Sequence, residues 1–229
     1  MIVRTKGVAR ALFLAAAGLT IAGLAGQLVR FLLGFDFAYG LIPALDLNGE
    51  SNIPTWYATI LLLLAALLLA LIAAEAWQAK RPYAVHWSGL AILLTLLSLD
   101  EAVAIHEQWI SPLRSLLGVT GLLYCAWVIP ALASVLLVVL VYWRFFFALP
   151  KATKRRFLLA AALYVGGALG VELLEGYYLS HGGVEETIAF ALMVGVEELL
   201  EMCGVVVLIE ALLYYLGKHL EGPLRVVER

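Results

Sequence analysis

Acidic side chains interrupt three segments of this sequence that are otherwise apolar. The first segment ends in LDEAVAIHEQ (residues 99–108), the second contains GVELLEG (170–176) and the third contains GVEELLEMCG (195–204). Their polar residues are Asp100, Glu101, His106 and Glu107 in the first, Glu172 and Glu175 in the second, and Glu197, Glu198 and Glu201 in the third. An acidic side chain in hydrocarbon costs about 2.5 to 3.5 kcal/mol on insertion scales, so such clusters mark a function by default.

Carboxylates and an imidazole presented by several helices are the ligands that hard and borderline metal ions prefer. We therefore predict a site for a divalent or trivalent metal ion, either iron, manganese or zinc. The expected metal ligands are Asp100, His106, Glu107, Glu172, Glu175, Glu198 and Glu201. The remaining acids, Glu197 and Glu101, are the candidates for catalytic proton transfer. His181, in a short loop, is a second candidate for a nitrogen ligand.

In its chemistry, this residue set resembles the carboxylate-rich sites of ferritin-like di-iron proteins. Those sites carry two Glu-x-x-His repeats, and this sequence has no such repeat. The resemblance covers only the acidic clusters and identifies no family for the chain.

The composition indicates a multi-pass membrane protein. Hydrophobic residues make up 64% of the 229 residues and charged residues 14%, whereas soluble domains are about 25% charged. The formal net charge is only −2, and no basic stripe with interleaved aromatic residues is present, so a nucleic-acid partner is not expected.

Six segments are long and apolar enough to cross a bilayer, which requires about 20 residues each. We predict an all-α, polytopic bundle of six transmembrane helices that forms one integral membrane domain over residues 1–229. The expected spans are residues 8–33, 55–77, 87–107, 119–143, 157–180 and 187–216. Six spans place both termini on the same side of the membrane.

The distribution of basic residues predicts which side that is. With both termini cytoplasmic, all lysines and arginines except Arg30 and Arg114 lie in inner segments, as the positive-inside rule requires. The three acidic clusters then occupy the outer half of the bilayer. We expect an integral protein of a bacterial or archaeal plasma membrane whose site faces the outer side.

Helical spacing predicts that the acids converge. Residues three, four or seven apart share a helix face, as do Glu172 and Glu175, Glu198 and Glu201, and Asp100 and Glu107. These spans contain no lysine or arginine near the acids. The acids must therefore be protonated, face water or hold cations.

Three functions remain open at this stage. The leading one is a metal-dependent enzyme that acts on a lipid-soluble or lipid-attached substrate. The second is a proton- or cation-coupled transporter or channel that uses the same acids. The third is a noncatalytic subunit of a membrane complex, with protonated acids that hydrogen-bond between helices. The expected partners are membrane lipids and either a lipid-soluble substrate or an ion.

Two further features carry expectations. Cys125 and Cys203 lie in apolar runs, where a thiol usually behaves as a small buried hydrophobic group. Residues 34–54 form the longest outer loop, which either covers an outward-facing site or contains a short interfacial helix and a turn at Asn48 and Gly49.

Overall fold

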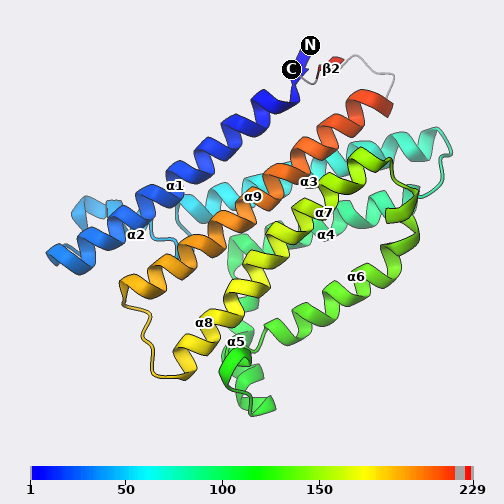
Figure 1. Ribbon diagram of the computed structural model, residues 1–229. Coiled ribbons are helices and arrows are strands. Elements are labelled where there is room, and N and C mark those ends of the chain that lie inside the picture. Colours follow the sequence, from blue (N-terminus) through cyan, green and yellow to red (C-terminus); the bar gives the residue numbers. More distant parts are fainter. Residues whose placement is uncertain (1, 220–224, 228–229) are drawn as a thin grey trace.

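The computed structural model describes residues 2–219 and 225–227, which form helices joined by loops and two three-residue strands. The elements are β1 (Ile2–Arg4), α1 (Thr5–Leu33), η1 (Ala38–Gly40), α2 (Leu41–Ala44), α3 (Ile53–Gln78), α4 (Ala84–Val103), α5 (Ile105–Leu117), η2 (Gly121–Leu123), α6 (Val128–Ala148), α7 (Lys151–Val165), η3 (Gly166–Val171), α8 (Glu172–Ser180), α9 (Ile188–His219) and β2 (Arg225–Val227). The strands β1 and β2 pair in parallel, so the two ends of the chain lie together at one end of the bundle (Figure 1). The opposite end is called the distal end below.

Five helical stretches are long and apolar enough to cross a membrane, as predicted for a multi-pass protein. They are α1, α3, α6, the continuous stretch from α7 to α8, and α9. A sixth crossing requires α4 and α5 together, and these two helices are bent by 80° where they meet. The side chains of α6 are mostly exposed, which fits a helix that faces lipid.

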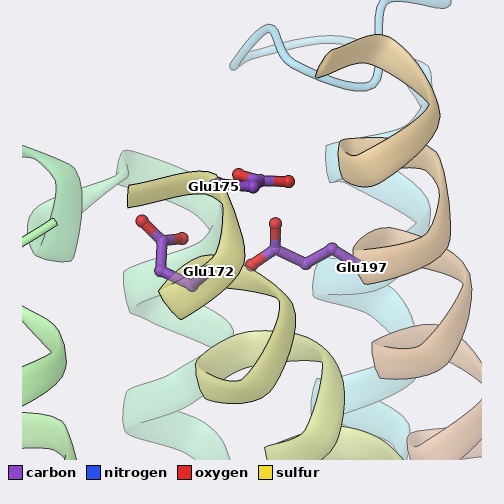
Figure 2. A group of neighbouring side chains, drawn as sticks. All are labelled: Glu172, Glu175 and Glu197. Carbon is purple, nitrogen blue, oxygen red and sulfur yellow. The ribbon is translucent and has the colours of Figure 1, made fainter. Parts of the chain in front are cut away.

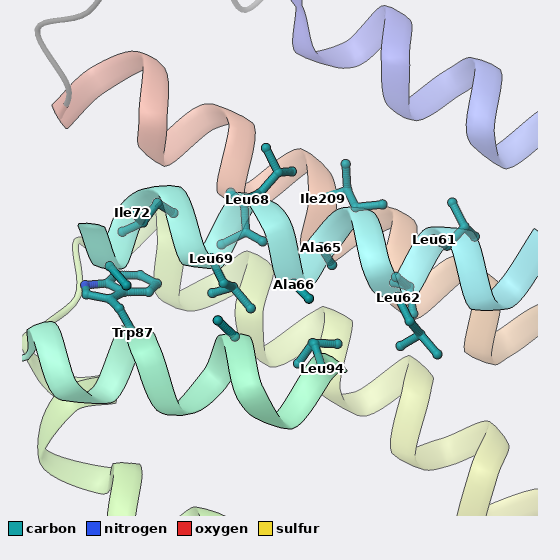
Figure 3. Close-up of a cluster of buried hydrophobic side chains, with 14 of the residues drawn as sticks. Leu61, Leu62, Ala65, Ala66, Leu68, Leu69, Ile72, Trp87, Leu94 and Ile209 are labelled. Atoms are coloured by element: carbon teal, nitrogen blue, oxygen red, sulfur yellow. The ribbon is translucent and has the colours of Figure 1, made fainter. Parts of the chain in front are cut away.

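The hydrophobic core surrounds α3, which packs against α4 and α9 (Figure 3). Leu61, Leu62 and Leu69 of α3 are almost completely buried, and Trp87 and Ile209 reach them from α4 and α9. An N-cap fixes the start of α3, because the side chain of Asn52 accepts the backbone N–H of Thr55. The helix α9 also contacts α1, α7 and η3, so it is the central helix of the bundle.

The expected third span is broken at Ala104. This residue adopts the left-handed conformation, with φ 49° and ψ 50°, which ends α4 at Val103. The backbone N–H of His106 then donates to Asp100 Oδ1 at 3.0 Å, which stabilises the new start at α5. The prediction that Asp100 and Glu107 share one helix face is therefore wrong, because they belong to different helices.

Two other boundaries differ from the expected ones. The helix α6 begins at Val128 rather than near residue 119, because residues 119–127 form a loop around the 3-10 turn η2. The stretch from α7 to α8 is interrupted by η3, which is a π-helix of six residues. Such π-helical turns are frequently found at functional sites, and this one lies directly before Glu172.

Candidate metal centre

Three glutamates meet between α8 and α9 in the distal half of the bundle. Glu172 and Glu175 lie on α8 and Glu197 lies on α9, and one carboxyl oxygen of each lies within 4.8 Å of those of the other two (Figure 2). Glu175 is only 5% exposed and Glu197 only 9% exposed, whereas Glu172 is partly exposed. We call these three residues the carboxylate triad.

Close helix packing brings the triad together. A Cβ atom built on Gly167 of η3 would lie 2.8 Å from the backbone oxygen of Glu197 and 2.9 Å from Cγ of Glu201. Only glycine therefore allows η3 to approach α9 this closely at the level of the triad. Glu172 and Glu175 follow within two turns and share a helix face because they are three residues apart.

The buried carboxyl oxygens of the triad have one another as their nearest possible hydrogen-bond partners. Glu175 and Glu197 form a hydrogen bond, which two carboxyl groups can make only when one of them carries a proton. Within the described ranges, no donor group reaches Oε1 of Glu175, although this atom is buried. Its polar neighbours are carboxyl groups, so a shared proton or a bound cation must satisfy it.

The arginines nearest to the distal end have other contacts. Arg30 lies 3.5 Å from Asp36 and 3.9 Å from Asp46, and the guanidinium of Arg114 lies 3.9 Å from the ring centre of Tyr124. Arg81 and Arg156 form ion pairs near the opposite end, with Glu75 at 2.9 Å and Glu210 at 3.9 Å. These four arginines therefore make their printed ion-pair and ring contacts with groups outside the triad.

A second acidic group lies beside the triad around the break between α4 and α5. Nδ1 of His106 lies 2.8 Å from Oδ2 of Asp100, and the His106 ring packs on Trp127 with ring centres 4.6 Å apart. Because Asp100 holds Nδ1, Nε2 is the nitrogen of His106 that can bind a ligand, and carboxylates commonly orient metal-binding histidines in this way. His106 also interacts electrostatically with Glu107 and Glu172.

The remaining predicted acids belong to this second group rather than to the triad. Glu198 interacts most strongly with Glu101, and Glu201 interacts with Glu198, Glu101 and Glu172. Tyr164 of α7 interacts with Glu201 and Glu101. The structure therefore brings the three acidic segments to one region, but it places Glu197 in the triad instead of Glu198 or Glu201. His181 is exposed and stacks on Tyr177, with ring centres 4.1 Å apart.

Glu50 joins the second group although sequence reasoning did not name it as a site residue. Its carboxyl group hydrogen-bonds to Glu107, so the loop between α2 and α3 reaches α5. Partial burial, together with the Glu107 carboxyl, raises the pKa of Glu50, and His106 opposes this shift. The sequence did offer one signal for Glu50, because its loop, residues 34–54, was expected to cover an outward-facing site. The short helix α2 and the bond from Gly49 N–H to Asp46 O, 3.1 Å, show that the loop also contains the helix and turn.

Cys125 is the second residue that sequence reasoning missed. It was expected to be a small buried hydrophobic group, and it is buried and not in a disulfide. Its thiol, however, interacts electrostatically with Glu172, Glu175 and Glu197. No sequence signal pointed to this interaction, because residues 119–127 were assigned to a regular helix.

Comparison with known families identifies the chain. It belongs to the family described as "Domain of unknown function (DUF8692)", whose model matches residues 11–216. No curated protein and no solved structure matches the chain. Any function must therefore be argued from the site itself.

Proposed function

We propose that this protein binds a divalent metal ion at the carboxylate triad, within the outer half of the membrane. The observation that carries the proposal is the buried oxygen of Glu175, which faces other carboxyl groups and no donor. A cation between Glu172, Glu175 and Glu197 would satisfy all three side chains at once. Among the candidate metals, a set of three carboxylates suits manganese best, and iron and zinc are the other two candidates.

A metal ion accounts for the triad better than protonation alone. Hydrogen bonds between helices in membranes contribute on average only about 0.6 kcal/mol each, whereas every buried acid costs several times as much. A single shared proton satisfies one pair of carboxyl groups and leaves the third without a partner. One divalent ion contacts all three.

We further propose that the metal serves chemistry rather than structure. Three protein oxygens leave coordination positions free for water or substrate, which is the arrangement of catalytic metal sites. The bound ion would activate water or dioxygen, and the neighbouring group around Glu101 and His106 would accept or deliver protons. The substrate class is lipid-soluble or lipid-attached, because the surrounding helices expose apolar side chains to the bilayer.

The transporter alternative has less support. An ion pathway needs polar groups through the whole depth of the membrane, but α9 continues beyond Glu201 with buried apolar residues. These are Met202, Val205, Val206 and Ile209. The next acid on this helix, Glu210, pairs with Arg156.

The proposed orientation places both termini in the cytoplasm and the triad toward the outer side. The paired strands β1 and β2 support termini on a common side. The positive-inside rule supports the cytoplasmic assignment. Most lysines and arginines lie in segments that the predicted topology places on the same side of the membrane as the two termini. Labelling of cysteines introduced at Lys80 and at Val184 in intact cells tests the orientation, since only the second is expected to react with an impermeant reagent.

Elemental analysis of the detergent-purified protein tests the metal site directly. We expect stoichiometric iron, manganese or zinc in the natural protein and its loss in Glu175→Gln. The matched control is Glu210→Gln, which makes the same change on an acid near the opposite end of the bundle. A natural protein without metal, or metal that persists in Glu175→Gln, would refute the proposal.

A further inference from the structure

A cavity of about 390 Å³ lies at the turn between α3 and α4, far along the chain from the triad residues. This turn is at the end of the bundle where the chain termini meet, because Trp87 of α4 packs on Tyr215, near the end of α9, with ring centres 5.0 Å apart. Two basic residues, Lys80 and Arg81, line the cavity together with the first residues of α4. Basic side chains and the N-terminus of a helix all favour a negative charge, so the cavity suits an anion.

The end of α3 places a lysine where glycine is usual. The backbone N–H of Arg81 donates to the Ala76 oxygen at 2.8 Å, and that of Lys80 donates to the Trp77 oxygen at 3.2 Å, which is the Schellman pattern of a helix C-terminus. In this pattern the residue at the position of Lys80 is left-handed and usually glycine, and Lys80 has φ 49°. A side chain is strained there, and such strain is retained mainly at functional sites.

Lys80 also carries the uncompensated charge of the cavity. Arg81 forms an ion pair with Glu75 at 2.9 Å, so its positive charge is balanced. Lys80 is exposed, and within the described ranges no acidic side chain pairs with its ammonium group. The cavity therefore offers one positive charge without a counter-charge, which matches the single negative charge of a phosphodiester.

The apolar side chains of the cavity favour a lipid over a soluble phosphate. Trp77 and Val85 both line it and are 57% and 64% exposed. Nε1 of Trp77 donates to Ser88 Oγ at 3.1 Å, which holds the indole ring beside the cavity. Tryptophan is typical of the membrane–water interface, and α3 ends one residue later, at Gln78. An anion bound here lies at the level of the lipid headgroups, next to apolar surface that acyl chains can cover.

The side of the cavity formed by His86 has an unsatisfied polar atom. The ring of His86 stacks on Phe145 with ring centres 5.5 Å apart, and the Tyr142 hydroxyl donates to the His86 backbone oxygen at 3.2 Å. Nδ1 of His86 is buried, and no described residue forms a hydrogen bond with it. Buried polar atoms normally have a partner, so this side of the cavity favours a ligand that brings polar groups.

We propose that this cavity binds the phosphodiester headgroup of an anionic phospholipid, with the Lys80 ammonium group as its charge partner. Basic pockets between transmembrane helices bind such headgroups on the cytoplasmic side of membranes. The proposed orientation places the turn between α3 and α4 on that side. The lipid site is separate from the carboxylate triad, so neither proposal depends on the other.

The test is a titration of the full chain in detergent with phosphatidylglycerol, in which native mass spectrometry measures the bound lipid. We expect the natural protein to bind phosphatidylglycerol in preference to phosphatidylcholine, whose choline group cancels the phosphate charge. In Lys80→Gln the affinity should fall at least about fivefold, because one basic residue near an anionic membrane contributes about 1 kcal/mol. The matched control is Lys151→Gln, which removes an exposed lysine at the start of α7, outside the cavity, and should bind like the natural protein.

A second variant, Lys80→Gly, separates lipid binding from folding. Glycine relieves the left-handed strain, so this variant should unfold at a higher temperature than the natural protein and still lose as much lipid affinity as Lys80→Gln. Equal affinity of the natural protein and both Lys80 variants, or no preference for phosphatidylglycerol over phosphatidylcholine, would refute the proposal. Displacement of the lipid by inorganic phosphate would show that the cavity takes soluble phosphate, which overturns the assignment to a lipid.

Discussion

Replacing Gly167 with alanine should separate η3 from α9 and disturb the triad. The added methyl group would lie 2.8 Å from the Glu197 carbonyl oxygen and 2.9 Å from Glu201 Cγ, whereas packed heavy atoms prefer about 3.5 to 4.0 Å. The backbone oxygen cannot rotate away, so the helices must part by about half an ångström or more. Overpacking of this kind typically costs about 1 to 3 kcal/mol.

The same displacement should weaken metal binding. Functional groups must be held within about 0.5 Å of their working geometry, and the helix displacement expected in Gly167→Ala is at least that large. We expect a loss of metal affinity of about 10- to 100-fold, similar to the loss of an outer-shell partner. Two of the triad residues directly follow η3 and the third lies on α9. Moving η3 away from α9 therefore lengthens the distances between their carboxyl groups.

Gly170→Ala is the control, because it makes the same change in the same π-helix. No atom lies within 4 Å of the Cβ position at Gly170. The control should be neutral or more stable by up to about 1 kcal/mol, because alanine favours helices over glycine. Equilibrium unfolding in mixed micelles, followed by circular dichroism, measures stability, and elemental analysis measures metal. Equal stability and equal metal content in the two variants would show that the close approach of η3 to α9 does not organise the site.

Two further changes test the distal loop and the break between α4 and α5. The pKa of Glu50 is raised from 4.5, so its contribution to stability is present at low pH and is lost as pH rises through the raised pKa. At neutral pH, Glu50→Gln should therefore unfold at a higher temperature than the natural protein. The difference in unfolding temperature should vanish near about pH 4. A difference that does not depend on pH would contradict the raised pKa of Glu50. Ala104→Gly should stabilise the fold by up to about 1 kcal/mol, because the left-handed conformation costs alanine about 1 to 2 kcal/mol. Its control, Ala102→Gly inside α4, should lower the stability by about 0.5 to 1 kcal/mol in the same unfolding assay.

Hydropathy was sufficient to predict the helical bundle, because the bilayer fixes the length of each apolar segment. The break at Ala104 could not be predicted in the same way. Alanine is the best helix former and carries no signal for a left-handed conformation. The break is instead stabilised by a bond across it, from the backbone of His106 to Asp100, which exists only after the chain has turned. Local patterns cannot report a capping interaction of this kind.

The acidic segments were found from the sequence, but their grouping was not. Spacing predicts which residues of one helix share a face, and it does so for Glu172 and Glu175, which both follow the π-helix. It does not predict where that face points relative to another helix. A single extra residue in a helical turn rotates everything after it by about 100°, and η3 contains such an irregularity. Glu197 therefore meets the α8 face, although its neighbour Glu198 looked equally suitable.

The π-helix and its glycines explain why one helix can serve two acidic groups. Adjacent residues of α9 point about 100° apart, so Glu197 can turn toward α8 while Glu198 turns toward Glu101. On the α8 side this requires η3 to approach α9 closely at Gly167, which a larger residue at that position would prevent. Gly167 supplies the required small residue within the π-helix, where the α-helical register is broken. The irregular turn thus positions the acids of α8 against α9, and a regular α-helix would direct them elsewhere.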